Sequence, residues 1–90
     1  MFLLRTTAKF DKQVKKLPNE IRKVLPEKLK ILSDNPNHPS LRTKKNYSAS
    51  SQAKEKILES RVNDKYRMLW KYDGKRVILL LVIGNHKVVE

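Results

Sequence analysis

Four side chains in the last third of the chain are of the types that chemistry on a phosphate ester requires. Arg61 and Arg67 flank a short polar segment, Glu59 precedes Arg61 by two residues, and His86 follows a long apolar run. Arginine matches phosphate oxygens with a planar fork of donors and keeps its charge. Histidine titrates near neutrality and can give or take a proton. The set predicts phosphate binding with acid–base chemistry, in which Glu59 acts as a base or orients Arg61.

Each of these residues also has an interpretation without chemistry. A histidine just past a strand is often an ordinary surface residue, and two arginines can simply solvate an exposed sheet face. Glu59 can serve as a salt-bridge partner. The choice depends on whether these side chains share one face of one sheet, and therefore on the strands that carry them.

Residues 57–90 read as three strands separated by two turns. Asp73-Gly74 is a strong signal for a two-residue type I′ hairpin turn, which needs positive φ at both central positions. The run 77–83 (VILLLVI) has the length and apolar character of a strand buried on both faces. These strands form the scaffold of the expected fold.

The register of the first hairpin decides which side chains share a face. A three-residue turn at 63–65 places Arg61 opposite Arg67 and Glu59 opposite Leu69. A two-residue turn would put the two arginines on opposite faces, because a one-residue slip reverses side-chain direction. The three-residue turn separates polar from apolar residues more cleanly, so we expect it. The second face, expected to lie on the helices, then carries Leu58, Ser60, Val62, Tyr66, Met68 and Trp70.

The second hairpin extends the charged face. A two-residue turn at Asp73-Gly74 pairs Arg67 with Leu80 and Lys71 with Arg76. His86 is then expected at an end of the sheet. The charged face is predicted to hold Glu59, Arg61, Arg67, Lys71 and Arg76.

The first half of the chain predicts a strand followed by two helices. Residues 2–4 suit a strand, and a threonine can cap a helix that starts at Ala8 and ends before Pro18. A second helix, capped by Asn19, runs to about Asp34 and either kinks or breaks at Pro26. The order β-α-α-β-β-β predicts an α+β fold, with an antiparallel helical hairpin packed on a mainly antiparallel four-stranded sheet.

The chain of 90 residues is expected to form one domain, 1–90, with a mobile basic and serine-rich loop at 43–54. Its 21 Lys and Arg against 9 Asp and Glu give a formal charge of +12. Such an excess favours a polyanionic or acidic partner over a merely solvated surface. Tyr47, in this loop, is a candidate for stacking on a base. Generic phosphate contacts are expected from Lys44, Lys45, Lys54, Lys56, Lys65 and Lys71.

Several classes of site and location are disfavoured by the composition. The chain has no cysteine, two histidines and two glycines, which argues against a metal site and a glycine-rich nucleotide loop. We therefore expect no cofactor. No run reaches the roughly 20 apolar residues of a membrane helix, and the start does not resemble a signal peptide. A cytoplasmic protein is expected.

Three short motifs, in this order of elements, resemble the RelE/ParE superfamily of toxin–antitoxin toxins. They are the segments 35–42 (NPNHPSLR), 61–67 (RVNDKYR) and 84–86 (GNH). The likeness is closer to the RelE-like mRNA endonucleases than to the ParE branch. It implies that Arg67 binds the scissile phosphate, that Arg61 is the basic residue before the turn, and that His86 occupies the position of a catalytic arginine or histidine.

The resemblance implies a metal-independent endoribonuclease that cleaves mRNA on the ribosome, with an acidic antitoxin as its partner. In such cleavage the 2′-OH attacks the adjacent phosphate, helped by a base, by positive charge and by an acid for the leaving oxygen. The alternative is a non-catalytic protein of the same fold, a ParE-like DNA gyrase inhibitor or an RNA binder. Lys87 and the residues after it, which replace an acidic and an aromatic residue of many members, favour that alternative.

Overall fold

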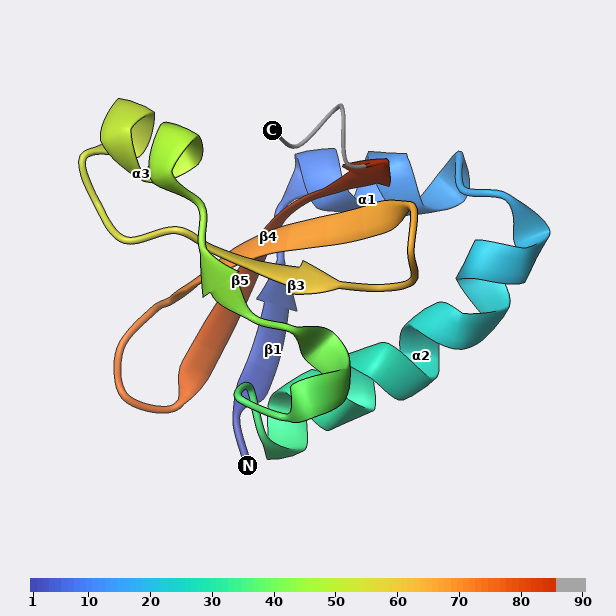
Figure 1. The fold of residues 1–90 in the computed structure, drawn as a ribbon, viewed down its shortest axis with the longest axis horizontal. Helices are drawn as coiled ribbons and strands as arrows, with labels where there is room; N and C mark the ends of the chain where they lie inside the picture. Colours follow the sequence, from blue (N-terminus) through green and yellow to red (C-terminus); the bar gives the residue numbers. More distant parts are fainter. Residues whose placement is uncertain (86–90) are drawn as a thin grey trace.

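The computed structural model describes residues 1–85, and it has the expected α+β architecture (Figure 1). Helices α1 and α2 lie against one side of the sheet, and helix α3 stands apart from them at the opposite end of the view. The elements are β1 (Leu3–Thr6), α1 (Ala8–Lys15), α2 (Asn19–Asp34), the 3₁₀ turn η1 (Pro39–Leu41), β2 (Lys44–Lys45), α3 (Tyr47–Ala53), β3 (Leu58–Arg61), β4 (Tyr66–Tyr72) and β5 (Val77–Asn85).

The sheet has five strands in the order β1-β5-β4-β3-β2, one more than expected. Strand β1 runs parallel to β5, and the other neighbours are antiparallel. The additional strand, β2, is only two residues long, and such a short edge strand leaves no recognisable alternation in the sequence. Within residues 1–85, no helix is long and apolar enough to cross a membrane.

The helix ends follow the expected residues with one exception. Thr7 caps α1, since its hydroxyl accepts a hydrogen bond from the backbone N–H of Phe10 at 3.1 Å. The expectation for Asn19 is wrong, because Pro18 occupies the cap position of α2 and Asn19 is already helical. The fixed φ of Pro18 suits the start of a helix. Helix α2 continues through the exposed Pro26, so the predicted alternative of a break is also wrong.

The main core lies between the two long helices and one face of the sheet. It is formed by side chains of α1, α2 and η1 packed on β3, β4 and β5, among them Phe10, Leu25, Leu32, Leu41, Met68, Trp70, Ile78 and Leu80. A second, smaller cluster joins Ile57 and Leu69 to Ala49 of α3 on the other face. The strand β5 is thus fully buried on one face and half-buried on the other, rather than equally buried on both.

The first hairpin has the predicted register. Arg61 pairs with Arg67 and Glu59 with Leu69, and the backbone N–H of Val62 donates to the carbonyl of Tyr66. The turn therefore comprises residues 63–65. Apart from Leu69 and Ser60, apolar side chains of the two strands lie on one face and charged ones on the other, which is the pattern that led to this register.

The predicted register of the second hairpin is wrong. Arg67 pairs with Gly84 instead of Leu80, and Lys71 pairs with Leu79 instead of Arg76. One cause is the turn, which closes at the hydrogen bond from Asp73 N–H to the Val77 carbonyl and leaves Gly74 (φ 87°) and Arg76 outside the ladder. Arg76 therefore lies in the turn, not on the charged sheet face.

A bulge in β5 is the second cause. Leu69 pairs with Val82 and Trp70 with Leu80, so Leu81 is an additional residue without a partner in the ladder. Side chains near α1 bind the backbone around it. The Thr7 hydroxyl donates to the Leu81 carbonyl at 3.0 Å, and Gln13 Oε1 accepts from the N–H of Ile83 at 2.9 Å.

Residues 43–54 are not the irregular loop that the sequence predicts. They contain β2 and the seven-residue helix α3, while the expected mobility of this segment stays a prediction. The Asn46 side chain caps α3 by accepting from the N–H of Ala49 at 2.8 Å. Inside the helix, the buried Ser50 hydroxyl donates to the carbonyl of Ile57 and accepts from its N–H. Short polar side chains, rather than an apolar stripe, thus attach this segment to the sheet.

Candidate phosphate-binding site

A pocket of about 250 Å³ lies on the charged face of the sheet. Four of the predicted residues line it together with Arg42: Glu59, Arg61 and Arg67 of the proposed catalytic set, and Lys44 of the generic phosphate contacts. The pocket thus contains four cationic side chains and one carboxylate, which gives it a formal excess of three positive charges. Such an enclosed excess of positive charge attracts a phosphate group.

Arg67 is the most firmly held cation of the pocket. Its Nη1 donates to the backbone carbonyls of Asn63 at 2.6 Å, Asp64 at 3.0 Å and Tyr66 at 3.1 Å. Its Nε lies 3.8 Å from Glu59 Oε2, and both side chains are largely buried, with 14% and 12% exposed. The guanidinium is thereby fixed against the turn between β3 and β4.

Glu59 connects three neighbours at the centre of the pocket wall. Its Oε1 accepts a hydrogen bond from Asn46 Nδ2 at 3.0 Å, and its Oε2 faces both Arg67 and, at 4.0 Å, the Nζ of Lys44. The sequence analysis suggested that Glu59 orients Arg61, but the arginine that Glu59 contacts is Arg67. Glu59 contacts Arg67, because the two residues are diagonal neighbours on adjacent strands.

Arg61 is held much more loosely. Its Nη1 reaches the exposed carboxylate of Asp64 at 3.5 Å, a distance at which the interaction is weak. Within residues 1–85, its Nε is buried and lacks a hydrogen-bond partner. An unpaired buried donor costs about 1–3 kcal/mol, so the observed position of this side chain is not its best-satisfied one. Among residues 1–85, Arg61 thus makes one weak ion pair and has a buried donor available to a further acceptor.

Arg42 and Lys44 are pocket residues that were not predicted as such, although Lys44 was expected to bind phosphate generically. Arg42 ends the 35–42 motif in the left-handed conformation, with φ 46° and ψ 46°. Thr43 fixes the segment between them, since its hydroxyl donates to the Pro36 carbonyl and contacts the Ser60 hydroxyl, both at 2.7 Å. The sequence did contain a signal for Arg42, because it is the last residue of the segment 35–42, one of the three motifs that resemble the toxin superfamily.

The remaining predicted lysines are distributed over different surfaces. Lys45 lies over the ring of Tyr47, with 5.1 Å from Nζ to the ring centre. Lys71 forms an ion pair with Glu55 at 2.9 Å, which neutralises its charge locally. Lys54 and Lys56 line a pocket beside α3, and Lys65 lies at the turn between β3 and β4. These lysines do not converge on the pocket of Arg42, Lys44, Glu59, Arg61 and Arg67.

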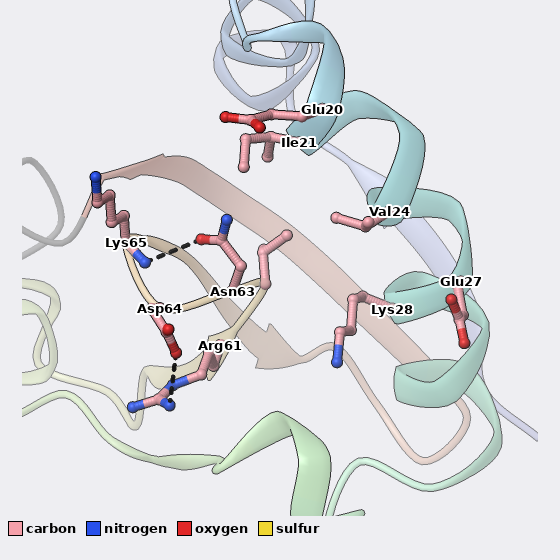
Figure 2. Close-up of a pocket in the computed structure, with 10 residues that line it drawn as sticks. Glu20, Ile21, Val24, Glu27, Lys28, Arg61, Asn63, Asp64 and Lys65 are labelled. Carbon is pink, nitrogen blue, oxygen red and sulfur yellow. Dashed lines mark hydrogen bonds and ion pairs between the residues drawn. The ribbon is translucent and has the colours of Figure 1, made fainter.

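A larger open groove of about 660 Å³ separates α2 from the turn between β3 and β4 (Figure 2). Glu20, Ile21 and Val24 project into it from α2, and Asn63 lies opposite them on the turn, whereas the side chain of Lys65 extends away from α2. Figure 2 shows the guanidinium of Arg61 turned away from α2, toward Asp64. This groove and the candidate phosphate-binding pocket of Arg42, Lys44, Glu59, Arg61 and Arg67 share Arg61, which lies between them.

Of the two histidines, His38 is described by the structure and His86 is not. His38 caps the start of the η1 turn, because its Nδ1 accepts a hydrogen bond from the N–H of Ser40 at 3.1 Å. His86 lies outside the described residues. Strand β5 ends at Asn85, and Gly84 pairs with Arg67 across the sheet. The predicted role of His86 stays a prediction.

Comparisons with known proteins identify the fold. No protein-family model and no curated protein matches the chain. Among solved structures, it is similar to YafQ from E. coli, with a TM-score of 0.76, 14% identity and coverage of 99% of this chain and 98% of that one. A metal-bound toxin from Helicobacter pylori gives 0.74 with 18% identity over the whole of both chains. RelE in the RelE–RelB complex of Pyrococcus horikoshii gives 0.72, with 18% identity over 93% of each chain. The chain therefore has the fold of the RelE/YafQ toxin family.

Proposed function

We propose that this chain is the toxin of a toxin–antitoxin pair and an endoribonuclease that cleaves mRNA. The observation that carries the proposal is the pocket in which Arg42, Lys44, Arg61 and Arg67 surround one small volume on a RelE-like fold. Its size and its excess of positive charge suit one phosphate of a nucleic-acid backbone.

The proposed reaction is an intramolecular transfer at phosphorus. The 2′-oxygen of the nucleotide attacks the adjacent phosphorus while the bond from phosphorus to the 5′-oxygen breaks, which leaves a 2′,3′-cyclic phosphate and a 5′-hydroxyl. A base takes the 2′-OH proton and an acid protonates the 5′-oxygen. Negative charge grows on the phosphate oxygens between these steps, and preorganised cations lower the barrier at that point.

The residues divide this work according to how they are held. Arg67, fixed by backbone carbonyls and by Glu59, is the preorganised cation for the scissile phosphate. Arg61, with its weak contact to Asp64, turns to the same phosphate when it binds. Glu59 positions Arg67 rather than serving as the base, because it is already engaged by Asn46 and Arg67. His86 is the proposed acid or base, on the strength of its residue type and place in the sequence.

The proposed partners follow from charge and from the similar proteins. RelE of Pyrococcus horikoshii was crystallised with RelB, and YafQ of E. coli with DinJ. We propose that an acidic antitoxin binds this chain and neutralises part of its charge of +12. The ribosome is the proposed site of mRNA cleavage, where it would supply part of the substrate geometry.

Primer extension on mRNA bound to programmed ribosomes tests the proposal. The unmodified protein should generate new 5′ ends, and Arg67→Ala or His86→Ala should abolish them, while Lys30→Ala on α2 should not. Cutting that persists undiminished in His86→Ala would remove His86 from the mechanism. If the unmodified protein leaves mRNA intact but induces DNA-damage signalling on expression, the alternative of a gyrase inhibitor is correct.

A further inference from the structure

Tyr47, the first residue of α3, is the aromatic side chain most exposed beside the phosphate-binding pocket. Its residue surface is 76% exposed, although α3 as a whole is attached to the sheet through Ser50 and Ala49. The core makes no use of its ring. An exposed tyrosine by itself needs no explanation, so the inference depends on what surrounds this one.

Asn46 fixes Tyr47 relative to the pocket. The Oδ1 of Asn46 caps α3, and its Nδ2 donates to Glu59 Oε1. The backbone N–H of Asn46 also donates to the Ile57 carbonyl at 2.9 Å. Asn46 itself is buried, with 8% exposed. The residue that immediately precedes Tyr47 is thus bound to the carboxylate that holds Arg67.

Two shallow hollows lie against Tyr47. One, of about 300 Å³, is lined by Lys44, Asn46, Tyr47 and Glu59, among others. It shares Lys44 and Glu59 with the phosphate-binding pocket, so the two adjoin. The other, of about 430 Å³, is lined by Tyr47, Lys54 and Lys56, among others. Tyr47 therefore lines two hollows, one that adjoins the phosphate-binding pocket and one that contains further lysines.

This combination of groups matches single-stranded RNA, in which bases alternate with phosphates along the chain. Aromatic rings bind bases by stacking, and basic side chains follow the backbone. Lys45 lies over the Tyr47 ring, and with most of the residue exposed a ring face is left for a base. We infer that Tyr47 is a stacking platform for the nucleobase next to the phosphate held by Arg67, and that it favours purines, whose larger rings stack more strongly. This inference rests on the proposed function, because it requires RNA at the pocket.

Binding of short fluorescein-labelled oligoadenylate and oligouridylate, measured by fluorescence anisotropy with the whole chain, tests it. Tyr47→Leu, which keeps the apolar bulk and lacks the ring, should weaken oligoadenylate binding about tenfold or more. It should weaken oligouridylate binding less, so that the preference for adenine declines. Tyr47→Phe keeps the ring and should bind like the unmodified protein. Thermal unfolding should be unchanged in both variants, since the ring contributes nothing to the core.

The outcomes separate the inference from the function on which it rests. If Tyr47→Leu binds both oligonucleotides as tightly as the unmodified protein while Arg67→Ala binds neither, the stacking role is wrong and the RNA pocket stands. A loss in Tyr47→Phe as large as in Tyr47→Leu also overturns the stacking role, and equal losses for both oligonucleotides overturn the preference for purines. If the unmodified protein binds neither oligonucleotide and does not cut mRNA on ribosomes, the inference and the proposed function are both wrong.

Discussion

The indole Nε1 of Trp70 donates a hydrogen bond of 2.8 Å to the hydroxyl of Ser60 in the interior of the protein. Both side chains are fully buried. Ser60 also contacts the hydroxyl of Thr43 at 2.7 Å, and Thr43 donates in turn to the carbonyl of Pro36. A short line of hydrogen bonds thus runs from the core to the segment that places Arg42 and Lys44 at the pocket.

Ser60→Ala should lower the free energy of unfolding by about 1–3 kcal/mol, because it leaves the buried Trp70 donor without its acceptor. Urea unfolding followed by tryptophan fluorescence measures the change. Ser51→Ala, at an exposed position of α3, should stay within about 0.5 kcal/mol of the unmodified protein. Equal stability of the two variants would mean that the hydrogen bond to Trp70 contributes little.

Arg67→Lys should reduce mRNA cleavage about 100-fold or more, although it retains the positive charge. The ammonium group cannot reproduce a guanidinium that binds three carbonyls through Nη1 and faces Glu59 through Nε. Single-turnover cleavage on programmed ribosomes gives the rate. Arg61→Lys is the matched comparison and should lose less, since the contact of Arg61 within the described part of the chain is the weak one to Asp64. A larger loss for Arg61→Lys would reverse the proposed division of roles.

Arg42→Gly and Arg42→Ala should have similar activity but different stability. Both remove the guanidinium from the pocket and should slow cleavage to a similar extent. Glycine adopts the left-handed conformation found here without strain, whereas alanine is disfavoured by about 1 kcal/mol. Thermal unfolding alongside the cleavage assay separates the two effects. Full activity in either variant would exclude Arg42 from phosphate binding.

The register of the first hairpin could be predicted because the sequence itself distinguishes the alternatives. Placing Arg61 opposite Arg67 puts Leu58, Val62, Met68 and Trp70 on one face and leaves Leu69 as the apolar residue beside Glu59, and the structure has this arrangement. The register of the second hairpin could not be predicted in the same way. Residues 77–83 are all apolar, so neither a longer turn nor the additional residue Leu81 disturbs any visible alternation.

The sequence predicted the pocket residues that lie on regular strands but did not predict that Arg42 and Lys44 join them. Glu59, Arg61 and Arg67 belong to regular strands, whose geometry relates spacing to direction. Arg42 and Lys44 come from a segment held by Thr43 and Ser60 through hydrogen bonds between residues far apart in the chain. Helix α3 was missed because its residues, YSASSQA, lack an apolar stripe. Its connection to the sheet depends on the capping and backbone contacts of Asn46 and Ser50, which sequence periodicity cannot indicate.

Lys44→Ala should make RNA binding less sensitive to salt. Each phosphate contact to single-stranded RNA contributes about −0.7 to the slope of log K against log salt concentration. Removing one pocket lysine should therefore reduce the magnitude of the slope by about that amount. Anisotropy titrations at several salt concentrations give the slope. Lys30→Ala, on the exposed part of α2, removes the same charge and should leave the slope unchanged; equal changes in both would indicate a diffuse charge effect.

Gln13→Leu should destabilise the end of β5 by about 1–3 kcal/mol, since the N–H of Ile83 loses its acceptor beside the bulge. Gln13→Glu keeps an acceptor oxygen at this position and serves as the control. Hydrogen exchange of the Ile83 amide reports the local opening directly. Protection in Gln13→Leu as high as in the unmodified protein would show that the bulge does not depend on this side chain.

The bulge at Leu81 also divides β5 into two halves with opposite parity. Up to Leu80 the buried side chains have even numbers, Ile78 and Leu80, and beyond the bulge the buried residue is Ile83, with an odd number. Polar substitutions along this strand should therefore be tolerated least at even-numbered positions up to Leu80 and at the odd-numbered position Ile83. The alternation is interrupted at residues 81 and 82. A relative that gains or loses one residue at this point would reverse the directions of residues 83–85 relative to the sheet, so that position 84 would no longer share a face with Arg67.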